Sequence, residues 1–357
     1  MRRPPKVAII GAGIIGAAIS YHLAKAGASP LIVDAGAGGG EATAASWAWL
    51  NASWGNPPNY VQLRRRSLAL WRDLGKDIPG LPLRFCGSLT YDLSDTDLDR
   101  FAREFHSDDY PVRLVGPDEI ARLEPHLSLR PNRAAHCPAE GVVEPSAASA
   151  LLRERALALG ATFRSLMRID RLLTESGRIV GFMSGGERTK LDIAVVCAGT
   201  GTPELLASAG CTLPMACPEG LLVHTEPLPP VLRGLIIAPD LHVRQTDQGR
   251  LVAGFDFAGN VVDEPAKAAN RLIDSMNAQL RLPEPARLAF TTVGLRPTPA
   301  DGFPVVGFVP AVEGLYVASM HSGMTLAAAI GKFAAAEIVA TAAEPLLGPY
   351  RPDRLTV

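Results

Sequence analysis

The chain has 357 residues, a length that allows about two domains with sizeable cores. Hydrophobic residues make up 47% of it and charged residues 20%, which is typical of a soluble globular protein. The formal net charge of −1 argues against nucleic acid as a partner.

The N-terminal stretch predicts a strand–helix–strand unit. Residues 7–10 and 31–33 are short apolar runs, each long enough for one buried strand, and residues 17–26 have the spacing of a helix. A G-x-G-x-x-G motif occupies residues 11–16, directly after the first strand, and Asp34 follows the second strand. In this context the motif favours dinucleotide binding over a purely structural turn.

Each motif position has a physical role in that interpretation. Gly11 permits the tight turn, Gly13 lets the backbone approach a pyrophosphate, and Gly16 lets the helix pack closely on the strand. The N-terminus of the helix supplies free N–H groups and a positive dipole end for the phosphates. Asp34 can accept hydrogen bonds from a ribose hydroxyl.

Small residues and tryptophans follow the second strand. The glycine-rich residues 36–40 and the small residues 42–46 allow a close approach to the cofactor phosphates, and the alternative is a flexible surface loop. Trp47, Trp49 and Trp54 either line a pocket for the substrate or pack into the core. An amphipathic helix is predicted over residues 60–76, and we expect its Arg-Arg-Arg run at 64–66 to form a solvated face.

The rest of the chain alternates helices and strands. We predict helices at residues 95–106, 117–123, 147–159 and 264–280, and strands at 85–93, 134–136, 161–170, 179–183, 191–197 and 315–318. The short strands at 221–225, 235–237, 241–244 and 250–254 indicate an antiparallel sheet. A last helix, over 325–343, carries Lys332 and Glu337, so we expect a buried helix without membrane insertion.

The cysteines and the N-terminus bear on location. Five cysteines without a C-x-x-C pair argue against a disulfide framework and a metal site. The first apolar run is only four residues long and ends in the glycine motif, so it is not a signal peptide. We therefore expect a cytoplasmic protein, whose oligomeric state the sequence leaves open.

Several stretches together resemble the D-amino-acid oxidase superfamily of FAD enzymes, and most closely its glycine oxidase and sarcosine oxidase branch. They span the chain in order, at residues 11–16, 141–145, 195–199, 294–304 and 321–323. The resemblance implies an α/β protein: a Rossmann-like FAD-binding domain with an inserted α+β substrate domain on an antiparallel sheet. We expect the FAD-binding domain at 1–80, 140–210 and 285–357, and the substrate domain at 81–139 and 211–284.

The resemblance also implies FAD as cofactor. Sarcosine oxidases tether their flavin through a cysteine just ahead of the segment that matches Arg296. Here Val293 and Gly294 hold that place, and the last cysteine is Cys217, so we expect noncovalent FAD. The cofactor-binding residues implied are Gly11, Gly13, Ile14, Ile15, Gly16, Asp34, Thr43, Ala44, Ala45, Ser46, Ala198, Gly199, Arg296, His321, Ser322, Gly323, Met324 and Thr325.

The substrate-binding residues implied are Arg296, His242, Arg244 and Trp49. Arg296 matches the arginine that holds the substrate carboxylate in glycine oxidases, and its alternative is a structural salt bridge. His242 falls near a tyrosine position of that family, which is a departure, and it can also be a packed strand residue. Arg244 shares the face of His242 and is either a second anion contact or an exposed strand arginine.

The implied reaction is FAD-dependent oxidation of an amine next to a carboxylate to an imine, followed by hydrolysis. The end of the last helix, at His321, is implied to lie against the flavin, where its dipole stabilises negative charge. Hydride transfer to the flavin needs no protein base, and the sequence suggests none. Glycine, an N-substituted glycine such as an N-carboxymethyl amine, or a D-amino acid fits as substrate.

Oxygen or another electron acceptor can reoxidise the flavin. Two alternative functions of the protein stay open. One is a flavoprotein dehydrogenase subunit of a heteromeric complex that uses a non-oxygen acceptor. The other is a nicotinamide-dependent dehydrogenase, which leaves the segments around Arg296 and His321 unexplained.

Overall fold

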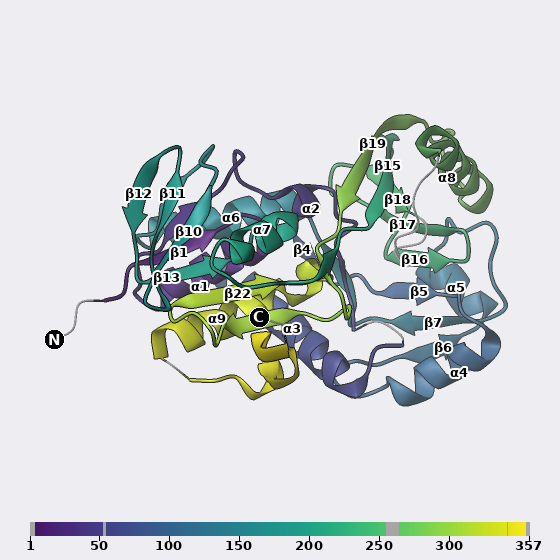
Figure 1. The fold of residues 1–357 in the computed structure, drawn as a ribbon. Coiled ribbons are helices and arrows are strands. Elements are labelled where there is room, and N and C mark those ends of the chain that lie inside the picture. Colours follow the sequence, from purple (N-terminus) through teal and green to yellow (C-terminus); the bar gives the residue numbers. More distant parts are fainter. Residues whose placement is uncertain (1–3, 53–54, 255–263, 341, 355–357) are drawn as a thin grey trace.

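A computed structural model describes residues 4–52, 55–254, 264–340 and 342–354, so Trp54 lies outside the described residues. The described chain forms two lobes, each built on one large sheet (Figure 1). The predicted α/β class is confirmed.

The first lobe contains the N-terminal glycine motif. Its sheet has the order β21-β22-β13-β1-β2-β9 and is parallel except for β21. The strands are β1 (Val7–Ile10), β2 (Leu31–Val33), β9 (Thr162–Arg164), β13 (Ile193–Val196), β21 (Val305–Phe308) and β22 (Leu315–Ser319). Except for the edge strand β9, these strands are almost entirely apolar, which suits strands that are buried on both faces. This strand order places segments that are far apart in the sequence next to one another in the same sheet.

Helices cover the first sheet and share one core. They are α1 (Ile14–Lys25), α3 (Pro58–Asp77), α6 (Pro145–Ala158) and α9 (Gly323–Ala340). The shorter α2 (Glu41–Ala44) and α7 (Thr202–Ala207) lie near the β1–α1 turn, and an antiparallel sheet of β10 (Arg171–Glu175), β11 (Arg178–Ser184) and β12 (Glu187–Lys190) packs alongside (Figure 1).

Within the described residues, α9 alone has the length and hydropathy to cross a membrane, and 72% of that window is buried inside the protein. It packs against α1 and α3, so it is a core helix as its sequence predicts.

The second lobe has an eight-stranded sheet in the order β19-β15-β18-β17-β16-β5-β7-β6. All neighbours are antiparallel except β16 and β5. The strands are β5 (Ser88–Thr90), β6 (Arg113–Val115), β7 (Ala134–Cys137), β15 (Glu219–Pro227), β16 (Leu235–Ala238), β17 (Leu241–Gln245), β18 (Arg250–Gly254) and β19 (Leu288–Leu295). Helices α4 (Asp95–Glu104), α5 (Pro117–Leu123) and α8 (Pro265–Gln279) flank it.

This sheet combines two distant parts of the chain, 88–137 and 219–295, as the idea of an inserted domain in two pieces requires. The predicted division assigns β19 to the FAD-binding segments, yet this strand pairs with β15 at the sheet edge. The strand predicted over 85–93 is confined to β5, and the one over 161–170 to β9. The domain boundaries themselves stay a prediction.

Short elements join the lobes. A small sheet of β3 (Trp49–Leu50), β4 (Leu83–Arg84) and β8 (Gly141–Val143) and a pair of β14 (Met215–Ala216) and β20 (Thr298–Pro299) lie where the chain crosses over. The 3-10 turns are Gly199–Gly201, Pro345–Tyr350 and Pro352–Arg354.

Candidate active site

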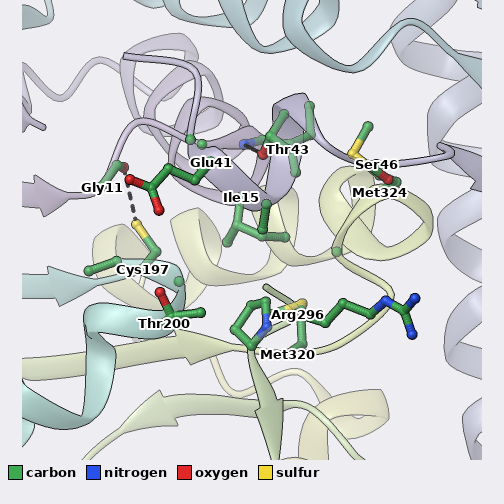
Figure 2. A pocket seen from close by; sticks show the side chains of 18 of the residues that line it. Gly11, Ile15, Glu41, Thr43, Ser46, Cys197, Thr200, Arg296, Met320 and Met324 are labelled. Carbon is green, nitrogen blue, oxygen red and sulfur yellow. Dashed lines mark hydrogen bonds between the residues drawn. The ribbon is translucent and has the colours of Figure 1, made fainter. Parts of the chain in front are cut away.

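One cavity of about 1240 Å³ runs between the two lobes. One end is lined by the β1–α1 turn, by residues 33–46 and by residues 197–201. The other end is lined by Trp47, Ala48, Trp49, Asn51, Asn56, Tyr60 and Arg64, by Gly220 and Leu222 of β15, and by residues 294–297, 302–303 and 318–325. Figure 2 shows Gly11 and Cys197 at the first end and Arg296 and Met320 toward the second. The volume is large enough for a dinucleotide and a small substrate together.

The β1–α1 turn presents the backbone of a helix end to the cavity. Gly11 has a φ of 109°, and a side chain there would overlap the carbonyl oxygen of Cys197, so only glycine fits. Helix α1 has Gly13 as its N-cap, without a side-chain cap and without an acid in the first turn. The positive end of its dipole is therefore available to a phosphate group.

Asp34 and Thr43 hold this turn in place. The carboxylate of Asp34 accepts hydrogen bonds from Ala12 N–H at 2.6 Å and from Gly36 N–H at 2.8 Å. Thr43 Oγ1 accepts one from Ile14 N–H at 3.1 Å. Because an ionised carboxylate has about four acceptor positions, Asp34 can still receive a ribose hydroxyl.

Arg296 projects from the cavity wall at the second end (Figure 2). Its side chain lies directly over Gly220 of β15, where a β-carbon would come within 2.9 Å of both Cζ and Nε and closer still to Nη2. The absence of a side chain at Gly220 thus leaves the space that the guanidinium occupies.

His321 lies beside Arg296 just before α9 begins. Burial, and then the charges of Arg296 and Arg64, lower the pKa of His321 to about 4, so the imidazole is neutral at pH 7. Its Nδ1 is 3.1 Å from Ser322 Oγ. Ser322 has a φ of 49°, a left-handed conformation that costs a non-glycine residue on the order of 1 kcal/mol and is typical of functional sites.

The comparisons with known proteins agree with this geometry. A family model described as "FAD dependent oxidoreductase" matches residues 6–337. The chain belongs to this FAD-dependent oxidoreductase family. It is similar to glycine oxidase of Bacillus licheniformis, at 27% identity over 94% of this chain and 93% of that one. It is also similar to one of the subunits of opine oxidase from Rhizobium meliloti, at 26% identity over 90% of this chain and 89% of that one.

Among solved structures, the chain resembles iminodiacetate oxidase from Chelativorans sp. BNC1, with a TM-score of 0.85 and 27% identity over 97% of this chain and 99% of that one. The predicted membership of the glycine oxidase-like branch is confirmed, and FAD, not a nicotinamide, is the cofactor of this oxidoreductase.

The predicted cofactor residues can be located on this FAD-dependent oxidoreductase. All of them line the cavity except Gly16, which packs beneath the turn against the carbonyl of Gly11. The uncapped helix end and the glycine backbone around it suit the diphosphate of FAD. Val293 and Gly294 stand ahead of Arg296, where a tethering cysteine would be, so the FAD is held noncovalently.

The expectation of a solvated Arg-Arg-Arg face is wrong for Arg64. Arg64 is only 4% exposed and lines the cavity. It donates to Asn51 O at 3.0 Å, Asn51 Oδ1 at 2.5 Å and Ser322 Oγ at 2.8 Å, and it lies over the Tyr60 ring. A sequence signal existed: Arg64 falls four residues after Tyr60 and three before Ser67, on the buried stripe of α3.

Two predicted substrate residues do not line the cavity. His242 Nε2 is 3.2 Å from Asp92 Oδ2. Arg244 is 3% exposed, not an exposed strand arginine; its Nε donates to Trp47 O at 2.7 Å and its Nη1 to Glu144 at 2.8 Å. The Trp47 segment covers the face of β17 that these two residues share, since Trp47 O accepts from Arg244 and the Trp47 ring lies 6.2 Å from the His242 ring, centroid to centroid. Arg244 supports the wall behind the cavity.

Trp49 does line the cavity, and behind it lies a carboxyl group that the sequence does not reveal. Trp49 Nε1 donates to Glu140 at 2.8 Å, and the Tyr110 hydroxyl also donates to Glu140. Burial raises the pKa of Glu140 to about 7, against the lowering effect of these hydrogen bonds. Glu140 therefore fixes the indole ring of Trp49 in the wall.

Proposed function

We propose that the protein oxidises an amine on the carbon next to a carboxylate to an imine, which water then hydrolyses. The observation that carries this proposal is Arg296, which projects into the cavity at the end opposite the uncapped N-terminus of α1. A cofactor that lies along the cavity from the β1–α1 turn would bring its reactive end toward this guanidinium.

The cofactor, Arg296 and His321 have different roles in the proposed reaction. Bound FAD supplies the two-electron oxidant. The planar guanidinium of Arg296 holds the substrate carboxylate by two parallel charge-assisted hydrogen bonds and thereby fixes the adjacent carbon. His321, with a pKa of about 4, stays neutral, so it adds a polar contact without a positive charge of its own. We keep the prediction that no protein base is required.

The substrate class follows from the carboxylate anchor. Glycine, an N-substituted glycine and a D-amino acid all place an amine next to a carboxylate. Two of the similar proteins, glycine oxidase and iminodiacetate oxidase, are named for substrates with this arrangement. Five free cysteines are compatible with a cytoplasmic location, which we retain as part of the proposal.

A second candidate is a dehydrogenase subunit of a heteromeric complex that passes electrons to an acceptor other than oxygen. One relative is named as a subunit of opine oxidase. In addition, the edge strand β19 exposes Leu288, Phe290, Val293 and Leu295, each between 42% and 50% exposed. Exposed apolar side chains on an edge strand suit contact with another chain.

One experiment tests the reaction. The purified protein is saturated with FAD, made anaerobic and mixed with glycine, sarcosine, iminodiacetate and D-alanine in turn, and the visible flavin absorbance is followed. Bleaching by at least one of them is expected. Readmission of oxygen then separates the two candidates, because an oxidase recovers its colour at once and a dehydrogenase needs a dye. A flavin that no amino acid reduces would refute the proposal.

A further inference from the structure

Arg64 is a buried positive charge at the substrate end of the cavity. It is 4% exposed and reaches the wall from the middle of α3, a helix whose neighbouring Arg66 points to solvent. Its hydrogen-bond acceptors are the backbone and side-chain oxygens of Asn51, the hydroxyl of Ser322 and, at 3.5 Å, the hydroxyl of Tyr60, all of which are neutral.

No carboxylate oxygen among the described residues lies within 4.0 Å of the Arg64 guanidinium. Burial of a charge without an opposite charge is unfavourable, and proteins usually pair such groups. Glu140 is near enough to feel the field of Arg64, but its oxygens bind Tyr110 and Trp49, and burial raises its pKa to about 7. Glu140 thus compensates only part of the charge.

The charges of Arg64 and Arg296 both act on His321. Both charges lower the pKa of His321, and Ser322, which follows His321, accepts a hydrogen bond from Arg64. Ser322, whose backbone is left-handed, therefore binds the second guanidinium directly before the first residue of α9. The substrate end of the cavity therefore contains two guanidinium groups, which come from distant parts of the chain.

We propose that Arg64 binds a second carboxylate of the substrate, so that the preferred substrate is a secondary amine with a carboxylate on each side. This rests on the proposed oxidation, in which Arg296 holds the first carboxylate. The amine loses a hydride from carbon and a proton from nitrogen, with the electron pair taken up by FAD. Water then cleaves the C=N bond and gives a 2-oxo acid and a primary amino acid.

A pair of substrates isolates the second carboxylate. Iminodiacetate and sarcosine differ only in an N-carboxymethyl group in place of an N-methyl group. We expect kcat/KM of the wild-type protein to be on the order of 100-fold higher for iminodiacetate. Arg64→Met should reduce this ratio by about the same factor, Arg64→Lys should reduce it less, and the exposed Arg66→Met is the matched control with an unchanged ratio.

A binding measurement gives a readout that needs no turnover. Oxydiacetate and methoxyacetate are ether analogues of the same pair and carry no oxidisable amine. Titration of the FAD-loaded wild-type protein, followed by the shift of the flavin spectrum and by calorimetry, should show oxydiacetate binding about 100-fold more tightly. This comparison uses the wild-type protein alone, so it decides whether the cavity binds a second carboxylate even where Arg64→Met fails to fold or to hold FAD.

The outcomes separate the two proposals. Equal binding of oxydiacetate and methoxyacetate, or an equal loss toward both amines in Arg64→Met, would overturn the role of Arg64 and show that it only holds Asn51 and Ser322. Turnover of sarcosine or glycine would still support the amine oxidation. Tight oxydiacetate binding without reduction by any amine would instead support the second carboxylate site and refute the oxidation.

Discussion

Gly220→Ala tests whether the position of Arg296 controls the reaction. The added methyl carbon would lie 2.9 Å from Cζ and Nε of Arg296, whereas ordinary contact begins at 3.4 Å. The guanidinium must therefore move by at least about 0.5 Å, and by more at Nη2, which lies closer. Since a misplacement of about 1 Å can cost about 100-fold in rate, we expect kcat/KM for a carboxylate substrate to fall by roughly 30- to 100-fold.

The assay is steady-state turnover with the amine that best reduces the flavin, alongside the FAD content and the melting temperature. Gly348→Ala is the matched control, because a β-carbon there meets nothing within 4 Å. Both variants should keep FAD and melt within a few degrees of the wild type. Unchanged turnover in Gly220→Ala would refute the reasoning, because it would mean that the guanidinium moves freely without effect on the substrate.

Three further variants address the anchor, the cofactor turn and the buried acid. Arg296→Leu should raise KM by two to three orders of magnitude, because truncating one partner of a buried charged pair costs about 3–5 kcal/mol; unchanged kinetics would remove Arg296 from the site. Gly11→Ala should lose FAD, measured by absorbance after gel filtration, because its φ of 109° and the nearby Cys197 carbonyl exclude a side chain. The pKa of Glu140 is raised from 4.5 to about 7, so the folded protein binds more protons between these pH values and its stability falls as pH rises through them. Glu140→Gln should flatten that decline, which amounts to about 3 kcal/mol, in denaturant titrations from pH 4.5 to 8; an equally steep decline would place its cause elsewhere.

The sequence predicts well what is local. The βαβ unit, the position of most helices and the segment that carries Arg296 depend on glycine spacing and on hydrophobic periodicity, and both act within a few residues. The structure has α1 and α9 where these patterns predict them. It also brings residues 11 and 296 to one cavity, which only the order of motifs along the chain suggested.

What the sequence could not decide is which face of an element meets the cavity. His242 and Arg244 share one face of β17, as alternation requires, but the Trp47 segment covers that face. The two basic neighbours of Arg64 suggest an exposed face, whereas its burial comes from α3 packing on α9 through Ser67 and Trp71. Tertiary packing of this kind has no signature in a window of a few residues.

The two arginines differ in how the fold supports them, and this difference bears on specificity. Arg296 lies over the bare backbone of Gly220, so its place depends on one missing side chain in β15. Arg64 is held by three hydrogen bonds to Asn51 and Ser322, on the segment before α3 and just before α9, and by a longer one of 3.5 Å to the Tyr60 hydroxyl. A guanidinium fixed by neutral acceptors keeps its full charge and some of its donors for a ligand. A change at Arg64 should therefore alter which amines are accepted, whereas a change at Arg296 or Gly220 should weaken the oxidation of all of them.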